Sequence, residues 1–328
     1  MCRHLARIGP PASLAAVLLE PAHSLLHQSY APADMRGGGT VNADGFGAGW
    51  YPDPVSGPAS DPVPGAVSGP AGPTRYRSAQ PIWSDASFAA LAASVRTGAV
   101  LAAVRSATTG MPVVGTAAAP FAEGRWLFSH NGVVRGWPGS VAGLAARLPV
   151  TDLLTLDAPT DSAVLWALVR HRLRAGEEPG AVLAETVAEV AVAAPGSRLN
   201  LLLTDGSTIW GTAWDHALSV RVADGEAIVA SEPTDEGPGW QPVPEGHLVI
   251  AAPDRVSYSA ITPVAAAGPS AVGAPAASVP GPDPNPTDPR QTDPRRTDPR
   301  PTDPRAADPA TRPHDPGQDL PEPRGAHR

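Results

Sequence analysis

The chain contains no lysine and only one cysteine, and each shortage excludes a class of protein. All 24 of its basic side chains are arginines, set against 32 acidic residues, for a formal net charge of -8. No basic stripe of the kind that follows a phosphate backbone is present, so we expect no nucleic-acid partner. A lone cysteine can form neither an intramolecular disulfide nor a CxxC metal site.

Long apolar runs are also missing, because no stretch reaches the roughly 18 residues that a membrane-spanning helix needs. The N-terminus weakly resembles a secretory signal, since Arg3 and Arg7 precede an apolar run at 12–19. That run is short and leads into Glu20-Pro21, which favours an amphipathic helix. We therefore expect a cytoplasmic protein that does not enter a membrane.

Proline and glycine are abundant but unevenly placed, with 41 and 33 residues respectively. Thr287-Asp288-Pro289-Arg290 recurs at a five-residue spacing up to Arg305, in a segment that has little to bury. Prolines this dense block helices and remove backbone donors, so we expect residues 263–328 to form a disordered tail. A second segment of this kind, at 52–73, is expected to be a flexible surface insertion.

The remaining sequence, residues 2–258, predicts one α+β domain in which helices alternate with sheet. Helical spacing of apolar residues is present at 86–95, 141–148, 162–174 and 181–193. Buried strands are expected at 99–105 and 125–129, and a turn at His130-Asn131-Gly132 should end the second.

A run of short strands is expected from residue 199 onward. Their ranges are 199–204, 207–214, 218–222, 227–231 and 247–251. Asp205-Gly206 and Asp224-Gly225 occupy positions typical of two-residue hairpin turns, so these strands should pair in antiparallel fashion.

The single cysteine is Cys2, directly after the initiator methionine. Removal of Met1 would leave a cysteine whose own α-amine can accept the thiol proton, so that one residue supplies both nucleophile and base. The alternative is a cysteine without a role in a frayed terminus. Only motifs elsewhere in the chain can decide between the two.

Attack on an acyl group also needs donors for the oxyanion that develops. The Asn131 side-chain amide and the Gly132 backbone N–H form a candidate pair, and in other enzymes the loss of one such donor costs ~2.7–4 kcal/mol. The alternative is an ordinary Asn-Gly turn at the end of a strand.

Two charged residues are candidates for binding the head group of an amino-acid substrate. Arg105 ends an apolar strand, where its planar guanidinium can bind an α-carboxylate with two hydrogen bonds. Asp161 can bind an α-ammonium group. Its alternative role is to cap a helix or complement the dipole at the helix start.

Cofactor and metal sites have little support in the sequence. The glycine-rich run at 42–51 lacks the GxGxxG spacing and continues as strand, so we interpret it as close backbone packing beside a site. The nine histidines are scattered, and we expect neither a metal nor a cofactor. His4 and His130 are candidates for the lining of the pocket.

Taken in order along the chain, these features resemble the class II glutamine amidotransferases. Within that family, the motifs at 103–108, 118–121 and 230–233 are most similar to a hydrolase branch that cleaves a γ-glutamyl conjugate in ergothioneine biosynthesis. The resemblance covers residues 2–258. The motifs shared with the wider family are Met1-Cys2-Arg3-His4, Asn42-Ala43-Asp44-Gly45-Phe46-Gly47, Arg105-Ser106-Ala107-Thr108, Ser129-His130-Asn131-Gly132-Val133-Val134 and Asp161-Ser162.

The resemblance implies an N-terminal-nucleophile hydrolase fold, a four-layer αββα sandwich of two antiparallel sheets between helical layers. It implies Cys2 as the nucleophile and Asn131 with Gly132 as the oxyanion hole. Arg105 would bind the α-carboxylate and Asp161 the α-ammonium of a small γ-glutamyl substrate. No cofactor is implied.

Two departures from the wider family bear on the reaction. Where that family often has histidines, this chain has Ala103 and Ala119, which favours the hydrolase branch over enzymes that supply ammonia. Two alternatives stay open, namely a glutaminase that serves a separate synthase and a secreted binding protein tethered by its tail. The sequence predicts no oligomeric state.

Overall fold

The computed structural model describes residues 2–34, 41–52 and 72–262, which belong to one compact unit. The expected insertion at 52–73 falls almost entirely outside the described residues, and the expected tail at 263–328 falls entirely outside them. The limits of the expected domain, 2–258, stay a prediction. The last described strand crosses the second limit and ends at Ala260.

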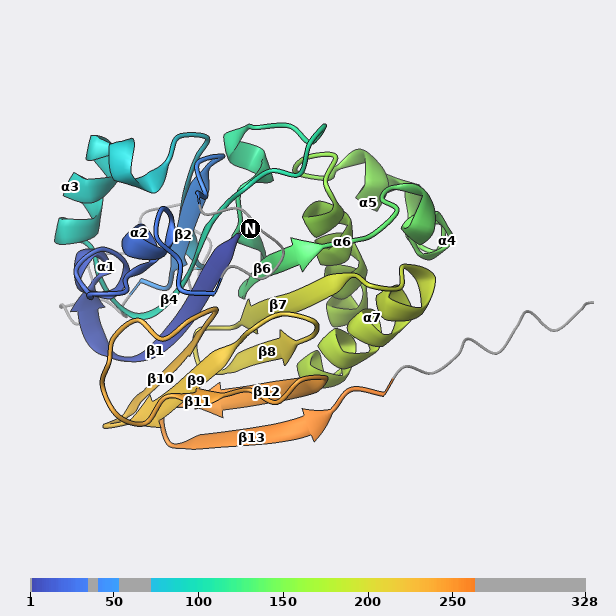
Figure 1. Cartoon of the computed structure of the whole chain (residues 1–328). Helices are drawn as coiled ribbons and strands as arrows, with labels where there is room; N and C mark the ends of the chain where they lie inside the picture. Colours follow the sequence, from blue (N-terminus) through green and yellow to red (C-terminus); the bar gives the residue numbers. More distant parts are fainter. Residues whose placement is uncertain (1, 35–40, 53–71, 263–328) are drawn as a thin grey trace, which may run out of the picture. The chain divides into compact units, whose positions relative to one another are not determined.

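Two antiparallel sheets form the centre of the unit (Figure 1). Among the described residues, the larger sheet has the strand order β11-β9-β10-β1-β4-β2-β3 and the smaller sheet has the order β13-β12-β8-β7-β6-β5. The strands of the larger sheet are β1 (Arg3–Ser13), β2 (Phe46–Trp50), β3 (Thr74–Ser78), β4 (Arg96–Val104), β9 (Ser219–Ala223), β10 (Glu226–Ala230) and β11 (Gln241–Pro242). Those of the smaller sheet are β5 (Phe121–Glu123), β6 (Trp126–Val133), β7 (Arg198–Thr204), β8 (Ile209–Ala213), β12 (His247–Ala252) and β13 (Arg255–Ala260).

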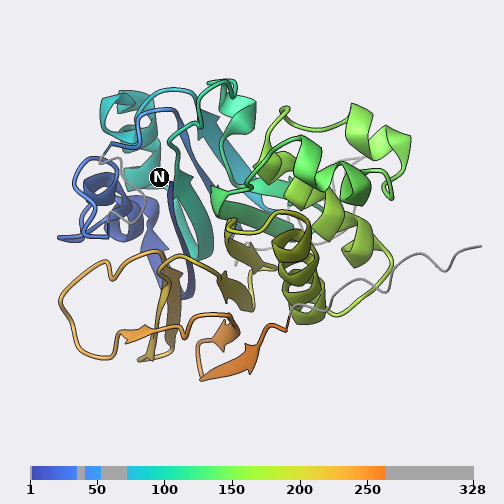
Figure 2. The same cartoon turned by 45° about the vertical axis from the view of Figure 1, so that its right-hand side comes forward.

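Helices cover the outer faces of both sheets (Figures 1 and 2). The larger sheet carries α1 (Leu14–Leu18), α2 (Leu25–Gln28) and α3 (Ala86–Ser94). The smaller sheet carries α6 (Asp161–Arg174) and α7 (Pro179–Ala193). Two shorter helices, α4 (Ala142–Ala145) and α5 (Val150–Leu154), lie beside α6, and the 3-10 turns are η1 (Ile82–Ser84), η2 (Gly115–Ala117) and η3 (Gly139–Val141). The expected αββα sandwich is confirmed.

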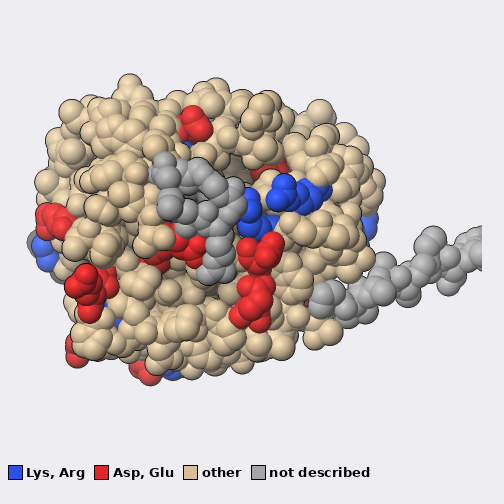
Figure 3. Space-filling model, viewed as in Figure 1, with Lys and Arg blue, Asp and Glu red and all other residues tan. Residues whose placement is uncertain are grey.

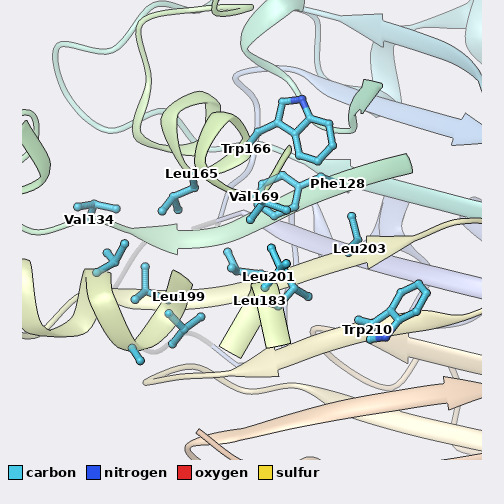
Figure 4. Close-up of a cluster of buried hydrophobic side chains, with 14 of the residues drawn as sticks. Phe128, Val134, Leu165, Trp166, Val169, Leu183, Leu199, Leu201, Leu203 and Trp210 are labelled. Atoms are coloured by element: carbon cyan, nitrogen blue, oxygen red, sulfur yellow. The ribbon is translucent and has the colours of Figure 1, made fainter. Parts of the chain in front are cut away.

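Apolar cores hold the layers together, and alternation along each strand divides side chains among them. On β6, Leu127 points into the core between the sheets, whereas Phe128 points toward α6. There its ring stacks on Trp166, with ring centroids 5.3 Å apart (Figure 4). Leu199, Leu201 and Leu203 of β7 complete this core from the sheet side.

Several expected elements are confirmed within one or two residues. The helices expected at 162–174 and 181–193 are α6 and α7, and the one expected at 86–95 is α3. Asp224 and Gly225 connect β9 to β10 with φ angles of 53° and 75°, as a two-residue hairpin turn requires. The helix expected at 141–148 is wrong in extent, because α4 spans four residues.

The turn expected at His130-Asn131-Gly132 is wrong. β6 continues through these residues and pairs with β7, with Gly132 opposite Leu199. A Cβ on Gly132 would lie 1.9 Å from the Arg198 carbonyl oxygen, which no side chain can tolerate. The glycine therefore permits the close approach of two strands, which is a role distinct from a turn.

The sequence does not predict β1, although this strand lies between β10 and β4 in the larger sheet. The stretch that weakly resembles a secretory signal thus forms β1 and α1. Its register shifts between Ile8 and Ala12, where Pro10 and Pro11 interrupt the pairing with β4. Prolines are compatible with a strand at such an irregularity because they have no N–H to donate.

The described part of the chain contains no helix with both the length and the apolarity to cross a membrane. On the face shown in Figure 3, uncharged residues cover most of the surface, and acidic and arginine side chains are interspersed among them. The expectation that the chain binds no nucleic acid stays a prediction.

Replacing the central tryptophan of the core beneath α6 tests the packing of that layer. Trp166 is 1% exposed, so Trp166→Ala should lower the free energy of unfolding by ~3–5 kcal/mol through lost burial and an unfilled cavity. Leu154→Ala, at a residue that is 79% exposed, should change it by less than ~0.5 kcal/mol. Urea unfolding of both variants measures the difference, and equal losses would contradict this description of the core.

Candidate functional site

The five candidate site residues occupy neighbouring ends of three strands and one helix. Cys2 directly precedes β1, and Arg105 directly follows β4. Asn131 and Gly132 lie near the end of β6, and Asp161 is the first residue of α6.

The pairing of β1 with β4 brings Cys2 to Arg105. Because Arg3 is opposite Val104 in this antiparallel pair, the residue before β1 and the residue after β4 lie at the same edge of the sheet. The Cys2 thiol donates to the Ser106 carbonyl oxygen at 3.7 Å, and the side chain is partly exposed. A molecule entering at this edge can therefore reach the sulfur.

Arg105 is a buried cation, 8% exposed, and within the described residues it forms no ion pair. Its Nη1 donates to the carbonyl oxygens of Pro112 at 2.8 Å and Asp44 at 3.4 Å. Backbone bonds from Asp44 N to Arg105 O and from Arg105 N to Gly45 O fix the main chain around it. The glycine-rich run thus packs beside the site, as expected, and the guanidinium is left without a carboxylate partner among these residues.

The Asn131 side chain lies in the space between the sheets and is fully buried. Its Nδ2 donates one hydrogen bond to the Ser231 hydroxyl at 3.0 Å, and an amide nitrogen carries a second N–H. Gly132 follows it on the strand. The two candidate oxyanion donors therefore lie at adjacent positions near the end of β6.

Asp161 is a buried carboxylate, 5% exposed, that joins α6 to the end of β6. Its Oδ2 accepts from Val134 N at 3.0 Å, and its Oδ1 accepts from Ser162 N at 2.8 Å. The helix cap is Thr160, whose hydroxyl accepts from Ala163 N, and Asp161 lies in the first turn, where its negative charge also complements the helix dipole. In the described part of the chain it forms no ion pair, which leaves its charge available to a cation.

His4 and His130 face different layers. The His4 ring lies between the sheets, with Nδ1 3.1 Å from the Ser129 hydroxyl. Burial, reinforced by His130, His216 and Arg3, holds the pKa of His4 well below its usual range. His130 turns toward α6 instead, where its ring nitrogens lie 3.0 Å from Ser162 Oγ and from Arg198 O.

A cleft of about 400 Å³ opens beside the site. One wall is the loop after Arg105, from Thr108 to Met111, and the other is the segment after Gly132, from Val133 to Pro138. Pro159, two residues before Asp161, completes the lining. The cleft thus adjoins the segments that carry Arg105, Gly132 and Asp161.

No three histidine, cysteine, aspartate or glutamate side chains of the described residues converge as metal ligands do. His23 and His27 on and beside α2 approach each other, with ring centroids 5.4 Å apart, but without a third ligand. The expected lack of a metal and a cofactor stays a prediction.

Two residues that contact this site have no role predicted from the sequence. Ser231 binds Asn131, and Glu232 binds Arg3 next to Cys2. The similarity of 230–233 to one branch of the family was the signal that could have identified them. Both residues make contacts between segments that are far apart in the chain, and a single sequence does not reveal such contacts.

Comparison with known proteins gives relatives that extend over most of the chain. The γ-glutamyl-hercynylcysteine sulfoxide hydrolase of Mycolicibacterium smegmatis is 42% identical over 265 residues, 80% of this chain and 100% of that protein. The protein of the same name from Mycobacterium tuberculosis is 38% identical over 263 residues, 80% of this chain and 97% of that protein. No model of a protein family matches the chain.

Among solved structures, a glutamine aminotransferase class-II domain protein from Silicibacter pomeroyi is similar in fold. It superimposes with a TM-score of 0.55 at 22% identity, over 80% of this chain and 100% of that one. At this identity the likeness shows the fold alone.

The lowered pKa of His4 predicts a loss of stability on acidification. Below the ~6.5 of a free histidine, the unfolded chain takes up a proton that the folded chain does not, so stability falls by up to ~1.4 kcal/mol per pH unit. Urea unfolding at pH 7.5 and 5.5 should show a smaller loss in His4→Asn than in the wild type. His171→Asn, at a histidine 45% exposed on α6, is the control, and an equal loss in all three proteins would contradict the assignment.

Proposed function

The chain belongs to the family of γ-glutamyl-hercynylcysteine sulfoxide hydrolases, and we propose that it cleaves the γ-glutamyl amide of γ-glutamyl-hercynylcysteine sulfoxide. The products are glutamate and hercynylcysteine sulfoxide, so the enzyme acts in ergothioneine biosynthesis. The observations that support this most are the contact of Cys2 with Ser106, the residue after the buried Arg105, and the lack of an ion-pair partner for either Arg105 or the buried Asp161 among the described residues.

Arg105 and Asp161 bind the two charges of the glutamyl head in this proposal. Burying a charge without a partner is costly, and a zwitterion that supplies the opposite charges offsets that cost. Arg105 receives the α-carboxylate, for which its planar fork is suited, and Asp161 receives the α-ammonium. A ligand with one of the two charges would leave the other residue uncompensated, so the pair selects a free amino-acid head.

Cys2 is the nucleophile once Met1 has been removed. The liberated α-amine accepts the thiol proton, and the sulfur forms a bond to the γ-carbonyl carbon of the substrate. The oxyanion that results accepts hydrogen bonds from the Asn131 side-chain amide and the Gly132 backbone N–H. This role agrees with the positions of both residues near the end of β6, a strand that contacts β1 through Ser129 and His4.

The intermediate then breaks down in two steps. The C–N bond breaks as the terminal ammonium protonates the leaving amine, which departs as hercynylcysteine sulfoxide. Water adds to the thioester left on Cys2, the C–S bond breaks, and glutamate leaves with the enzyme regenerated. The reaction uses a small-molecule substrate and no cofactor, and we place it in the cytoplasm.

The second candidate is a glutaminase that supplies ammonia to a separate synthase, because the same head-group contacts would bind free glutamine. Replacement of the family's histidines by Ala103 and Ala119 favours the hydrolase. The two functions differ in the leaving group, so they can be separated by the substrate that is turned over.

Incubation with γ-glutamyl-hercynylcysteine sulfoxide and with glutamine, side by side, tests the proposal. We expect kcat/KM for glutamate release from the conjugate to exceed kcat/KM for ammonia release from glutamine by at least ~10-fold. This ratio corresponds to ~1.4 kcal/mol of binding free energy from contacts with the leaving group. Cys2→Ala should release no glutamate from either while keeping the wild-type Tm, and intact mass should show loss of Met1 alone in the wild type.

Preference for glutamine would instead support the glutaminase. Turnover by Cys2→Ala near the wild-type rate would refute the nucleophile, and processing of the chain after about residue 20, beyond the h-region of a signal, would support the secreted alternative.

A further inference from the structure

We propose that Ser231 and Glu232 are positioning residues, which hold the first two residues of β1 so that Cys2 faces the oxyanion donor Asn131. The inference rests on the proposed function. It adds two residues that influence the reaction through their neighbours and do not touch the reacting atoms. Ser231-Glu232 directly follows β10, the strand that pairs with β1 on the side away from β4.

Ser231 joins the strand after Cys2 to the side chain of Asn131. Its N–H donates to His4 O at 2.9 Å, which extends the β1–β10 pairing by one bond beyond Leu5 and Ala230. Its hydroxyl accepts from His4 N at 3.0 Å and from Asn131 Nδ2 at 3.0 Å, and it lies 3.2 Å from His4 O.

A serine hydroxyl can donate once and accept twice, so these three contacts use all of its capacity. The residue is 1% exposed, and water has little access to replace it. One buried oxygen therefore sets the distance between β1 in the larger sheet and Asn131 in the smaller sheet. The side-chain amide that would stabilise the oxyanion is oriented by the same atom that fixes the nucleophile's strand.

Glu232 holds the adjacent residue on the opposite face of β1. Arg3 donates from Nε to Glu232 Oε1 at 2.6 Å and from Nη1 to the Cys2 carbonyl oxygen at 2.9 Å. The same carboxylate accepts from Ala33 N at 2.8 Å and from Asp34 N at 3.1 Å. The guanidinium thus connects the backbone of Cys2 to a carboxylate that two further N–H groups hold in place.

Alternation along β1 makes the two contacts complementary. Arg3 and His4 point to opposite faces of the sheet, so Glu232 holds the strand from the helix side and Ser231 holds it from the space between the sheets. Arg3 and Glu232 are 1% and 5% exposed. Since a buried ion pair contributes little net stability compared with apolar residues, its position beside Cys2 points to a geometric role.

The chain offers matched controls for both contacts. Arg7 and Glu226 form a second ion pair between β1 and β10, at 2.5 Å, four residues farther along β1 from Arg3. Thr212 has a fully buried hydroxyl that accepts from Leu201 N at 2.9 Å and donates to Leu199 O at 2.7 Å. None of these contacts involves Cys2 or Asn131.

The serine is tested by Ser231→Ala, Ser231→Thr and Thr212→Val, with kcat and KM for glutamate release and Tm measured for each. Ser231→Ala should lower kcat about 10- to 100-fold, as expected for a misplaced donor, and change KM less than about threefold because Arg105 and Asp161 are intact. Ser231→Thr, which keeps a hydroxyl, should recover at least about a third of kcat. Thr212→Val should lower Tm with kcat within about threefold of wild type.

The ion pair is tested by Glu232→Gln against Glu226→Gln in the same assays. Glu232→Gln should lower kcat by about 10-fold or more, and Glu226→Gln should leave it within about threefold. Ser231→Ala keeps the pair intact, so the proposal stays testable if Glu232→Gln fails to fold. A kcat for Ser231→Ala within threefold of wild type, or equal losses of kcat in the variants and their controls, would overturn it.

Hydrogen–deuterium exchange separates failure of this inference from failure of the proposed function. Amides of residues 3–5 should exchange at least about 10-fold faster in Ser231→Ala than in wild type, and no faster in Thr212→Val. Faster exchange together with a wild-type chain that releases no glutamate would refute the function and retain the structural contact. Unchanged exchange together with an active wild type would refute the contact alone.

Discussion

The position of Cys2 depends on β1, which hydrogen-bonds to β4 on one side and to β10 on the other. A terminal residue is ordinarily frayed, and here the strand that follows it lies inside a sheet. The pairing with β4 sets Cys2 beside Ser106, and the contacts after β10 set the same strand against Asn131. The start of β1 therefore fixes where Cys2 lies relative to the other residues of the site.

In the proposed mechanism, Arg105 and Asp161 give the site its selectivity through charge. Each is buried at the edge of a different layer, and each uses part of its hydrogen-bonding capacity on the backbone, through Pro112 O for the arginine and Val134 N for the aspartate. The folded protein therefore carries the desolvation cost of two separate charges before any substrate arrives. A zwitterionic head group offsets both at once, whereas a neutral amide offsets neither. The leaving group does not change the desolvation cost of these two charges. The residues that bind the head group therefore cannot by themselves distinguish a conjugate from glutamine.

Much of the outer architecture is predictable from local patterns. Apolar periodicity predicts α6 and α7, and the Asp224-Gly225 turn follows from the positive φ angles that these two residue types tolerate. The candidate site residues are predicted because their motifs occur in the same order along the chain as in the class II glutamine amidotransferases. The structure brings the segments that carry them together.

The parts that the sequence does not predict share one physical cause, which is long-range pairing. β1 lacks an apolar alternation because Arg3, His4 and Arg7 are buried polar residues whose partners lie more than a hundred residues away. Gly132 follows an asparagine, as in a turn, yet its conformation is decided by the Arg198 carbonyl on the neighbouring strand. Local propensity is overruled in both places by contacts that exist only in the folded chain.

Rapid-quench mass spectrometry of the enzyme mixed with γ-glutamyl-hercynylcysteine sulfoxide is the most direct measurement of the central claim. The account predicts a transient glutamyl adduct that maps to Cys2 as a thioester, forms before free glutamate accumulates, and disappears as turnover ends. An adduct on another residue, or steady glutamate release with no covalent species on Cys2 even under acid quench, would contradict it.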